Sequence, residues 1–152
     1  MKSRIYSDTS VLGGCEDDVF REPSRRLLAA FVAGELTLVL SELTLRELGT
    51  APEPVRAVVG RIPQAHIEIL ALSPEAEELA AAYIEDGAIG TRMRADALHI
   101  ALASVARVDV LVSWNFKHIV NLRRIHAYNA VNLKNGYPIL EIRTPHEVPG
   151  DE

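Results

Sequence analysis

Polar and apolar positions follow two different periods along this chain, and their alternation predicts a mixed α/β architecture. Short apolar runs typical of buried strands occupy about residues 4–8, 36–40, 66–72, 108–113 and 137–143. Between them, apolar residues recur at helical spacing over residues 23–33, after Ser41, after Pro52, from Pro74 to Gly87, and over about 92–106 and 121–134. Strands that alternate with helices typically form a parallel sheet covered by helices. We therefore expect a three-layer α/β/α fold with a central parallel sheet of four to five strands.

Length and composition fit one globular domain. The chain has 152 residues, of which 48% are hydrophobic and 24% charged, enough to bury about two-thirds of the unfolded surface. No internal repeat, linker or low-complexity segment interrupts the pattern. We expect a single domain over residues 1–148, followed by a flexible tail at residues 149–152.

Charge and cysteine content narrow the possible partners and compartment. Sixteen Lys and Arg against 21 Asp and Glu give a net charge of −5, so the chain lacks the basic character of non-specific nucleic-acid binders. Bound divalent cations or a local Arg cluster can still reverse the field near a site. The single Cys15 cannot form an internal disulfide, and no stretch approaches the ~20 apolar residues that span a bilayer. We expect a cytoplasmic protein without membrane contact.

Two acidic residues lie in apolar segments, where a carboxylate is unusual. Asp8 ends the first strand, and in an open α/β sheet the carboxyl ends of the strands border the ligand crevice. Asp96 lies in an apolar helix, on the same face as His99, and a carboxylate is rarely buried unless it is paired or ligates a metal. Each has a structural alternative, because Asp8 could cap the next helix and Asp96 could pair with Arg92 or Arg94.

Two further polar residues complete the candidate site. Glu47 lies late in the helix after Ser41, where an isolated glutamate would usually be solvated, and Asn115 follows the strand of residues 108–113. Together with Asp8 and Asp96, they suggest a metal-dependent nuclease. An aspartyl phosphatase with Asp8 as nucleophile is a weaker alternative, because residue 10 is Ser10 rather than a second acid.

In their order and spacing, these segments resemble the PIN-domain family, the fold of the VapC-type toxins of bacterial and archaeal toxin–antitoxin pairs. The resemblance covers nearly the whole chain. It rests on Tyr6-Ser7-Asp8-Thr9-Ser10, the helix from Ser41 to Leu48, the segment from Arg94 to Ala101, and Val110-Leu111-Val112-Ser113-Trp114-Asn115. It implies acids at the carboxyl edge of a parallel sheet that bind Mg²⁺ or Mn²⁺ and hydrolyse the RNA backbone. By the same resemblance, Asp8, Glu47 and Asp96 match the metal-binding acids.

The chemistry of these side chains agrees with such a metal. Mg²⁺ and Mn²⁺ prefer oxygen ligands, and Mg²⁺ usually keeps several waters with only one or two protein carboxylates. Zinc is disfavoured, because the five histidines and Cys15 match no zinc-ligand spacing. We expect Mg²⁺ or Mn²⁺ as the cofactor.

Asn115 departs from the family pattern, in which the corresponding position is commonly Asp in a Thr-x-Asp arrangement. An amide offers a metal only a neutral oxygen, so the change removes one charge and should weaken metal affinity. Two hypotheses follow. The chain is a metal-dependent endoribonuclease, the toxin of a type II toxin–antitoxin pair with Asp8, Glu47, Asp96 and Asn115 as its site, or it is a catalytically weakened RNA-binding or protein-interaction module of the same fold.

Several side chains near these acids are candidates for contacting RNA: Thr9, Ser10, Arg92, Arg94, Ser113, Lys117 and His118. Trp114 either packs in the core or stacks on a base. The resemblance also implies a homodimer and a cognate antitoxin, whose helix could dock on an apolar face near Leu27, Leu28 and Phe31.

Overall fold

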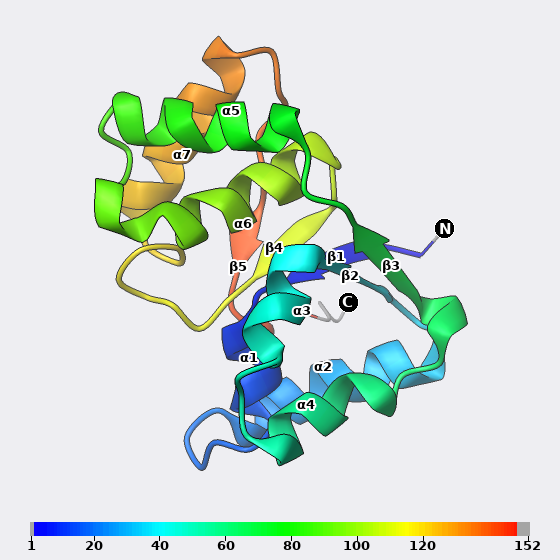
Figure 1. Ribbon diagram of the computed structural model, residues 1–152. Coiled ribbons are helices and arrows are strands. Elements are labelled where there is room, and N and C mark those ends of the chain that lie inside the picture. The colour runs from blue at the N-terminus through cyan, green and yellow to red at the C-terminus, as the bar shows by residue number, and fades with distance from the viewer. Residues whose placement is uncertain (1, 149–152) are drawn as a thin grey trace.

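A five-stranded sheet forms the centre of the protein, and the computed structural model, which describes residues 2–148, shows helices on both of its sides (Figure 1). The sheet order is β3-β2-β1-β4-β5, and every neighbouring pair is parallel. This confirms the predicted three-layer fold. The predicted flexible tail, residues 149–152, lies outside the described residues. The strands are β1 (Arg4–Ser7), β2 (Thr37–Ser41), β3 (Ile67–Leu70), β4 (Val110–Val112) and β5 (Ile142–Arg143).

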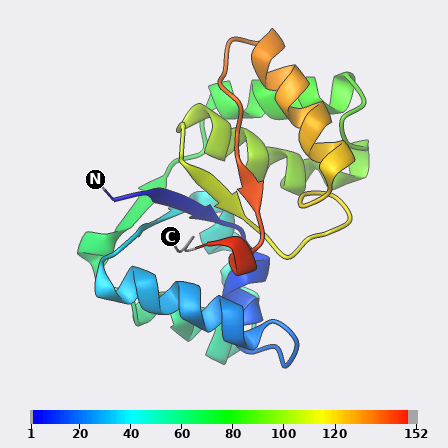
Figure 2. The same ribbon diagram turned by 180° about the vertical axis from the view of Figure 1, so that it is seen from behind.

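Two groups of helices cover the two faces of the sheet, as the views in Figures 1 and 2 show. The helices α5 (Pro74–Glu85), α6 (Arg94–Val105) and α7 (Leu122–Lys134) lie on one side. The other side is covered mainly by α2 (Arg21–Ala33) and α4 (Glu53–Gly60), while α1 (Thr9–Gly14) and α3 (Glu42–Leu48) directly follow the ends of strands. Within residues 2–148, no helix is long and apolar enough to cross a bilayer.

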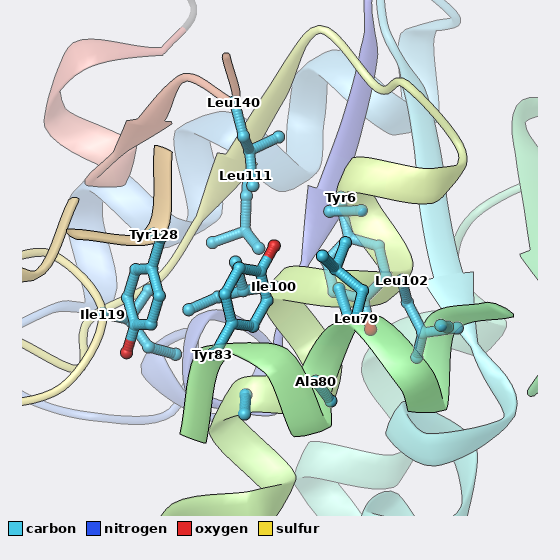
Figure 3. Close-up of a cluster of buried hydrophobic side chains, with 14 of the residues drawn as sticks. Tyr6, Leu79, Ala80, Tyr83, Ile100, Leu102, Leu111, Ile119, Tyr128 and Leu140 are labelled. Atoms are coloured by element: carbon cyan, nitrogen blue, oxygen red, sulfur yellow. The ribbon is translucent and has the colours of Figure 1, made fainter. Parts of the chain in front are cut away.

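Alternating side chains on the strands build one hydrophobic core on each face of the sheet. Tyr6 and Leu111 point into the core under α5, α6 and α7, which Figure 3 shows with the rings of Tyr83 and Tyr128. Ile5, next along β1, belongs to the opposite core with the residues of α2. Leu27, Leu28 and Phe31, which we expected beside an exposed docking face for an antitoxin, lie in this second core. They are only 0%, 8% and 2% exposed, so they do not themselves form such a face.

Two elements differ from the sequence prediction. Helix α1 was not predicted, because its six residues include two glycines and three β-branched or hydroxyl residues of low helix propensity. The last strand is much shorter than residues 137–143. Pro138 cannot donate a ladder hydrogen bond, and the side-chain amide of Asn129 bonds both the N–H and the C=O of Leu140, at 2.8 and 3.2 Å.

Candidate active site

The four predicted site residues come from four segments and meet at the carboxyl edge of the sheet. Asp8 directly follows β1, Glu47 lies in the last turn of α3, and Asp96 lies in the first turn of α6. Asn115 comes three residues after β4. Because Ser7 pairs with Val112 in parallel register, the residues that follow β1 and β4 lie side by side. The register therefore brings Asp8 and Asn115 to one edge, and the contacts of Glu47 with His99 and of Asp96 with Asn115 place the other two acids there.

Asp8 is held by two hydroxyl groups. Its carboxylate is buried, and it accepts hydrogen bonds from Ser10 Oγ on Oδ1 and from Ser113 Oγ on Oδ2, both at 2.7 Å. Ser10 Oγ in turn accepts the Trp114 N–H at 2.9 Å. Burial raises the pKa of Asp8, and the charge of His99 and the two hydroxyls oppose that rise without cancelling it. The structure thus fixes the orientation of a carboxylate that is costly to ionise.

Glu47 is held through one oxygen by a network that reaches into the core. Thr9 Oγ1 donates to Oε1, and His99 Nε2 contacts the same oxygen at 3.0 Å. His99 is almost fully buried, with Nδ1 2.7 Å from the hydroxyl of Tyr6, which lies 2.8 Å from Ser41 Oγ. Nε2–H donates to Glu47 and Nδ1 pairs with the Tyr6 hydroxyl, so both ring nitrogens of the imidazole have a partner.

The His99 contact also sets the charge state of Glu47. Partial burial raises the pKa of this carboxyl, but the hydrogen bonds from His99 and Thr9 and the charge of His99 outweigh burial and place it below its ordinary value. His99 was predicted to share a helix face with Asp96, but it was not among the predicted site residues. The apolar helix around this histidine was the available signal, because a buried imidazole needs partners.

Asp96 is paired with the residue that departs from the family pattern. Asn115 Nδ2 donates to Asp96 Oδ2 at 3.3 Å, while Asn115 Oδ1 accepts the His118 N–H at 2.9 Å. Burial raises the pKa of Asp96, opposed by the charges of His99 and His118 and by the Asn115 hydrogen bond. Both ends of the Asn115 amide are therefore engaged by the protein, including the oxygen expected to serve a metal. Its role as a metal ligand stays a prediction.

The oxygen donors of this edge fit a hard divalent cation. Within residues 2–148, no hydrogen bond engages Glu47 Oε2 or Asp96 Oδ1, so each carboxylate keeps one oxygen for a ligand. In the same part of the chain, no three His, Cys, Asp or Glu side chains are grouped closely enough to hold a metal ion as they stand. Mg²⁺ needs only one or two carboxylates, with water and phosphate as the remaining ligands. Asp8, Glu47 and Asp96 therefore suit such an ion better than Zn²⁺, whose structural sites need four protein ligands.

The predicted RNA-contacting residues fall into two groups. The hydroxyls of Thr9, Ser10 and Ser113 hydrogen-bond the acids, so their first role in the structure is to orient carboxylates. The basic candidates lie at the surface: Arg92, Arg94 and Lys117 are exposed, with Arg94 3.6 Å from Glu77, and His118 is half-buried. Contact of either group with RNA stays a prediction.

Trp114 belongs to the core, as the first of its two interpretations held. Its side chain is only 6% exposed, and its Nε1–H donates to Ser24 Oγ at 2.8 Å. The ring of Phe20 stacks on it, with centroids 4.3 Å apart and planes inclined by 18°. An aromatic wall therefore stands beside the acids.

The sequence matches a known family model, and the fold is similar to those of several solved structures. The chain matches the sequence model of the PIN domain over residues 5–137, whereas no curated protein matches it. It is similar in structure to FitAcB from Neisseria gonorrhoeae, with a TM-score of 0.60, 14% identity, and coverage of 95% of this chain and 99% of that one.

Two other solved structures are similar to the chain. For VapC20 of Mycobacterium tuberculosis, described as a toxin that cleaves the sarcin-ricin loop, the TM-score is 0.57 at 16% identity, covering 75% of this chain and 92% of that one. For a toxin–antitoxin complex from Klebsiella pneumoniae, the TM-score is 0.56 at 20% identity, covering 75% and 88%. At these identities, the likeness shows the shared fold.

Proposed function

The chain belongs to the PIN domain family, and from that premise we propose that it is a metal-dependent endoribonuclease acting as the toxin of a type II toxin–antitoxin pair. One observation carries the proposal. Asp8, Glu47 and Asp96 lie at the carboxyl edge of the sheet, where Ser113 donates to Asp8, the His99 ring contacts Glu47, and Asn115 donates to Asp96. Three acids drawn from distant segments to one edge suit a phosphodiester-cleaving site better than a structural role.

The similar structures support the substrate and the partner. One is described as a toxin that cleaves an RNA loop, and another is a toxin–antitoxin complex. We therefore include RNA as the substrate and a cognate antitoxin as a partner, and we add a homodimer from the family resemblance alone. Because Leu27, Leu28 and Phe31 are buried, an antitoxin would have to contact other, exposed side chains.

Each site residue has its own role in the proposed hydrolysis. A bound Mg²⁺ or Mn²⁺ would activate water and screen the charge that builds on the phosphate. Asp8, Glu47 and Asp96 would hold that ion through their oxygens, with Asn115 positioning a ligand water. Ser10 and Ser113 keep Asp8 in one orientation, while His99 and Thr9 keep Glu47 ionised and fixed. The oxygen of a water forms a bond to phosphorus, the bond to the leaving oxygen breaks, and the leaving oxygen takes up a proton.

A second candidate is a catalytically weakened module that binds RNA or protein. It is favoured by the hydrogen bond from Asn115 Nδ2 to Asp96, since the amide supplies a hydrogen-bond donor at a position where the family commonly has a further carboxylate. The site then carries one negative charge less, which reduces its attraction for a divalent cation. This module would bind RNA equally well with and without chelator and cleave it under no condition.

Cleavage of a mixed, structured RNA pool tests the proposal. The purified protein is incubated with Mn²⁺, Mg²⁺ or EDTA, beside an Asp8→Ala/Asp96→Ala double variant. Asp86→Ala is the matched control, because Asp86 lies at the end of α5 and pairs with Lys134 instead of the site acids. Metal-dependent cleavage that persists in the control and is lost in the double variant supports the nuclease. A folded protein that binds the pool but cuts nothing at any metal concentration supports the module.

A further inference from the structure

A pocket of about 410 Å³ opens beside the acids, and the two sites share residues. Its walls include Gly13, Asp17, Phe20 and Trp114, together with Ser10 and Asn115. Ser10 donates to Asp8 and Asn115 donates to Asp96, so one wall of the pocket is also the edge of the acidic site. A strand whose phosphate reaches the acids would therefore carry a neighbouring nucleotide into the pocket.

The rings of Phe20 and Trp114 form an aromatic wall of the pocket, and Phe116 lies next to this wall without lining the pocket itself. Phe20 is stacked on Trp114, and Phe116 lies 6.1 Å from Trp114 and 6.3 Å from Phe20 between ring centroids. Trp114 is locked in place by its bond to Ser24 and by the edge of His146 at 5.4 Å. Phe116 is 51% exposed although its neighbours are packed. A rigid wall with one exposed ring is suited to receive another flat, apolar surface.

The remaining walls of the pocket are polar. Asp17 Oδ1 accepts the N–H groups of Val19 and Phe20 at 2.8 and 3.3 Å, and no hydrogen bond within residues 2–148 engages its other oxygen. Ser10 and Asn115 add further polar atoms, and Lys117 is exposed next to Phe116. The volume falls at the lower end of small-ligand pockets, ~300–1,000 Å³. Flat aromatic contact combined with a polar rim matches a nucleobase more closely than the continuous apolar stripe of a peptide helix.

We propose that this pocket binds one unpaired base of an RNA strand, stacked on Phe20 and bordered at the pocket mouth by the exposed ring of Phe116, beside the nucleotide whose phosphate meets the acids. The proposal rests on the proposed function and adds to it a requirement for single-stranded substrate. The free oxygen of Asp17 accepts an N–H from the bound base, which adenine, cytosine and guanine supply from an amino group and uracil from its ring N3–H.

The only tryptophan of the chain makes the pocket directly observable. The intact protein is titrated with short single-stranded RNAs, in Ca²⁺ and in EDTA, while Trp114 emission is followed and a gel checks that the strands stay intact. The same strands are tested with one abasic nucleotide placed at each position in turn. We expect the base-bearing strands to quench Trp114, and one abasic position to abolish quenching and weaken binding about tenfold, the usual scale of base stacking.

Two variants separate stacking from general apolar contact. Phe116→Ala should weaken binding of the base-bearing strands about tenfold and leave the abasic strand unaffected. Leu133→Ala, which removes a 60% exposed side chain at the end of α7, should bind as the parent protein does. The abasic series on the unchanged protein keeps the test valid if Phe116→Ala folds poorly.

The outcomes distinguish this proposal from the proposed function. If RNA binds by anisotropy without quenching Trp114, or if abasic strands and Phe116→Ala bind with full affinity, the pocket is no base site. Phe116 would then serve another partner, such as a protein segment, and metal-dependent cleavage would leave the nuclease standing. If the protein neither binds nor cleaves RNA, the proposed function fails and the base site is refuted with it.

Discussion

Replacing Asn115 by Asp turns the contact with Asp96 from attraction into repulsion. In the structure, Asn115 Nδ2 lies 3.3 Å from Asp96 Oδ2 and donates a hydrogen bond to it. The substitution places a carboxylate oxygen where that nitrogen lies and leaves the His118 N–H with an acceptor. Asn115→Asp therefore changes one contact and one charge, with little change in shape.

The loss of stability follows from that distance. Two unit charges 3.3 Å apart repel by about 5 kcal/mol at an effective dielectric constant of ~20 and by about 1 kcal/mol in water. The lost hydrogen bond to a charged group is worth about 1.5 kcal/mol at this long distance. Asp96 is only partly buried, so water screens the pair, and we expect a total loss of about 3 kcal/mol. For a chain of this size, that lowers the melting temperature by about 6–12 °C.

The penalty depends on pH with a definite sign. Burial already raises the pKa of Asp96, and a second carboxylate beside it raises that pKa further. The destabilisation is therefore present at neutral pH and disappears as the pH falls through the folded-state pKa toward ~3.9, the unfolded value, since one proton then neutralises the pair. A bound divalent cation should also remove it, because the cation stabilises the folded state in proportion to its binding.

Thermal unfolding in EDTA and in Mn²⁺, at neutral and acidic pH, tests this account. Asn121→Asp is the matched control, because Asn121 caps α7 through its side-chain oxygen and Asp caps equally well. We expect Asn115→Asp alone to melt lower in EDTA and to gain more than the parent protein from Mn²⁺. Equal melting temperatures in EDTA at neutral pH would refute the reasoning. A gain in Mn²⁺ affinity without new RNA cleavage would favour the binding module over the nuclease.

Two further predictions concern the residues around the acids. Asp8→Asn should be more stable than the parent protein at neutral pH, because burial raises the pKa of Asp8 and its ionisation lowers the free energy of unfolding. In a series of urea denaturations, this advantage should vanish below pH ~4. Reduced stability of Asp8→Asn at neutral pH would contradict the prediction. Gly14→Ala should lose about 1–3 kcal/mol in the same assay, since a Cβ there would lie 2.5 Å from Ser24 Oγ and 2.7 Å from Trp114 Nε1. Gly13→Ala, which meets nothing within 4 Å, should instead gain about 0.5–1 kcal/mol, and equal effects at both glycines would refute the packing argument.

The sequence was informative where a residue conflicts with its local surroundings. An acid at the end of an apolar strand and an acid inside an apolar helix were both visible, and the structure brings Asp8 and Asp96 to one edge. The helix predicted after Ser41 is also present, and the Ser41 side chain caps it by accepting the Thr44 N–H. These features depend on a few neighbouring positions, which a single sequence records directly.

Other parts of the site depend on contacts between residues far apart along the chain. The hydroxyl of Ser113 orients Asp8 across 105 positions, and no local pattern indicates which hydroxyl does so. The hydrogen bond from Asn115 to Asp96 also depends on the packing of α6 against the loop after β4. The aromatic wall was missed for the same reason, because Phe20 and Trp114 are stacked only in the folded chain.

The central position of β1 has a consequence for how the protein is made. This strand comes from the start of the chain, yet it pairs with β4, whose residues are synthesised more than 100 positions later. Until β4 has emerged from the ribosome, Asp8 lacks Ser113, and the sheet lacks two of its five strands. Such distant pairing is slow to form and exposes unpaired strand edges on the way. A nascent chain that has not yet reached β4 therefore carries Asp8 and Glu47 without Ser113 and Asn115, so the edge at which these residues meet is assembled only after β4 has been synthesised.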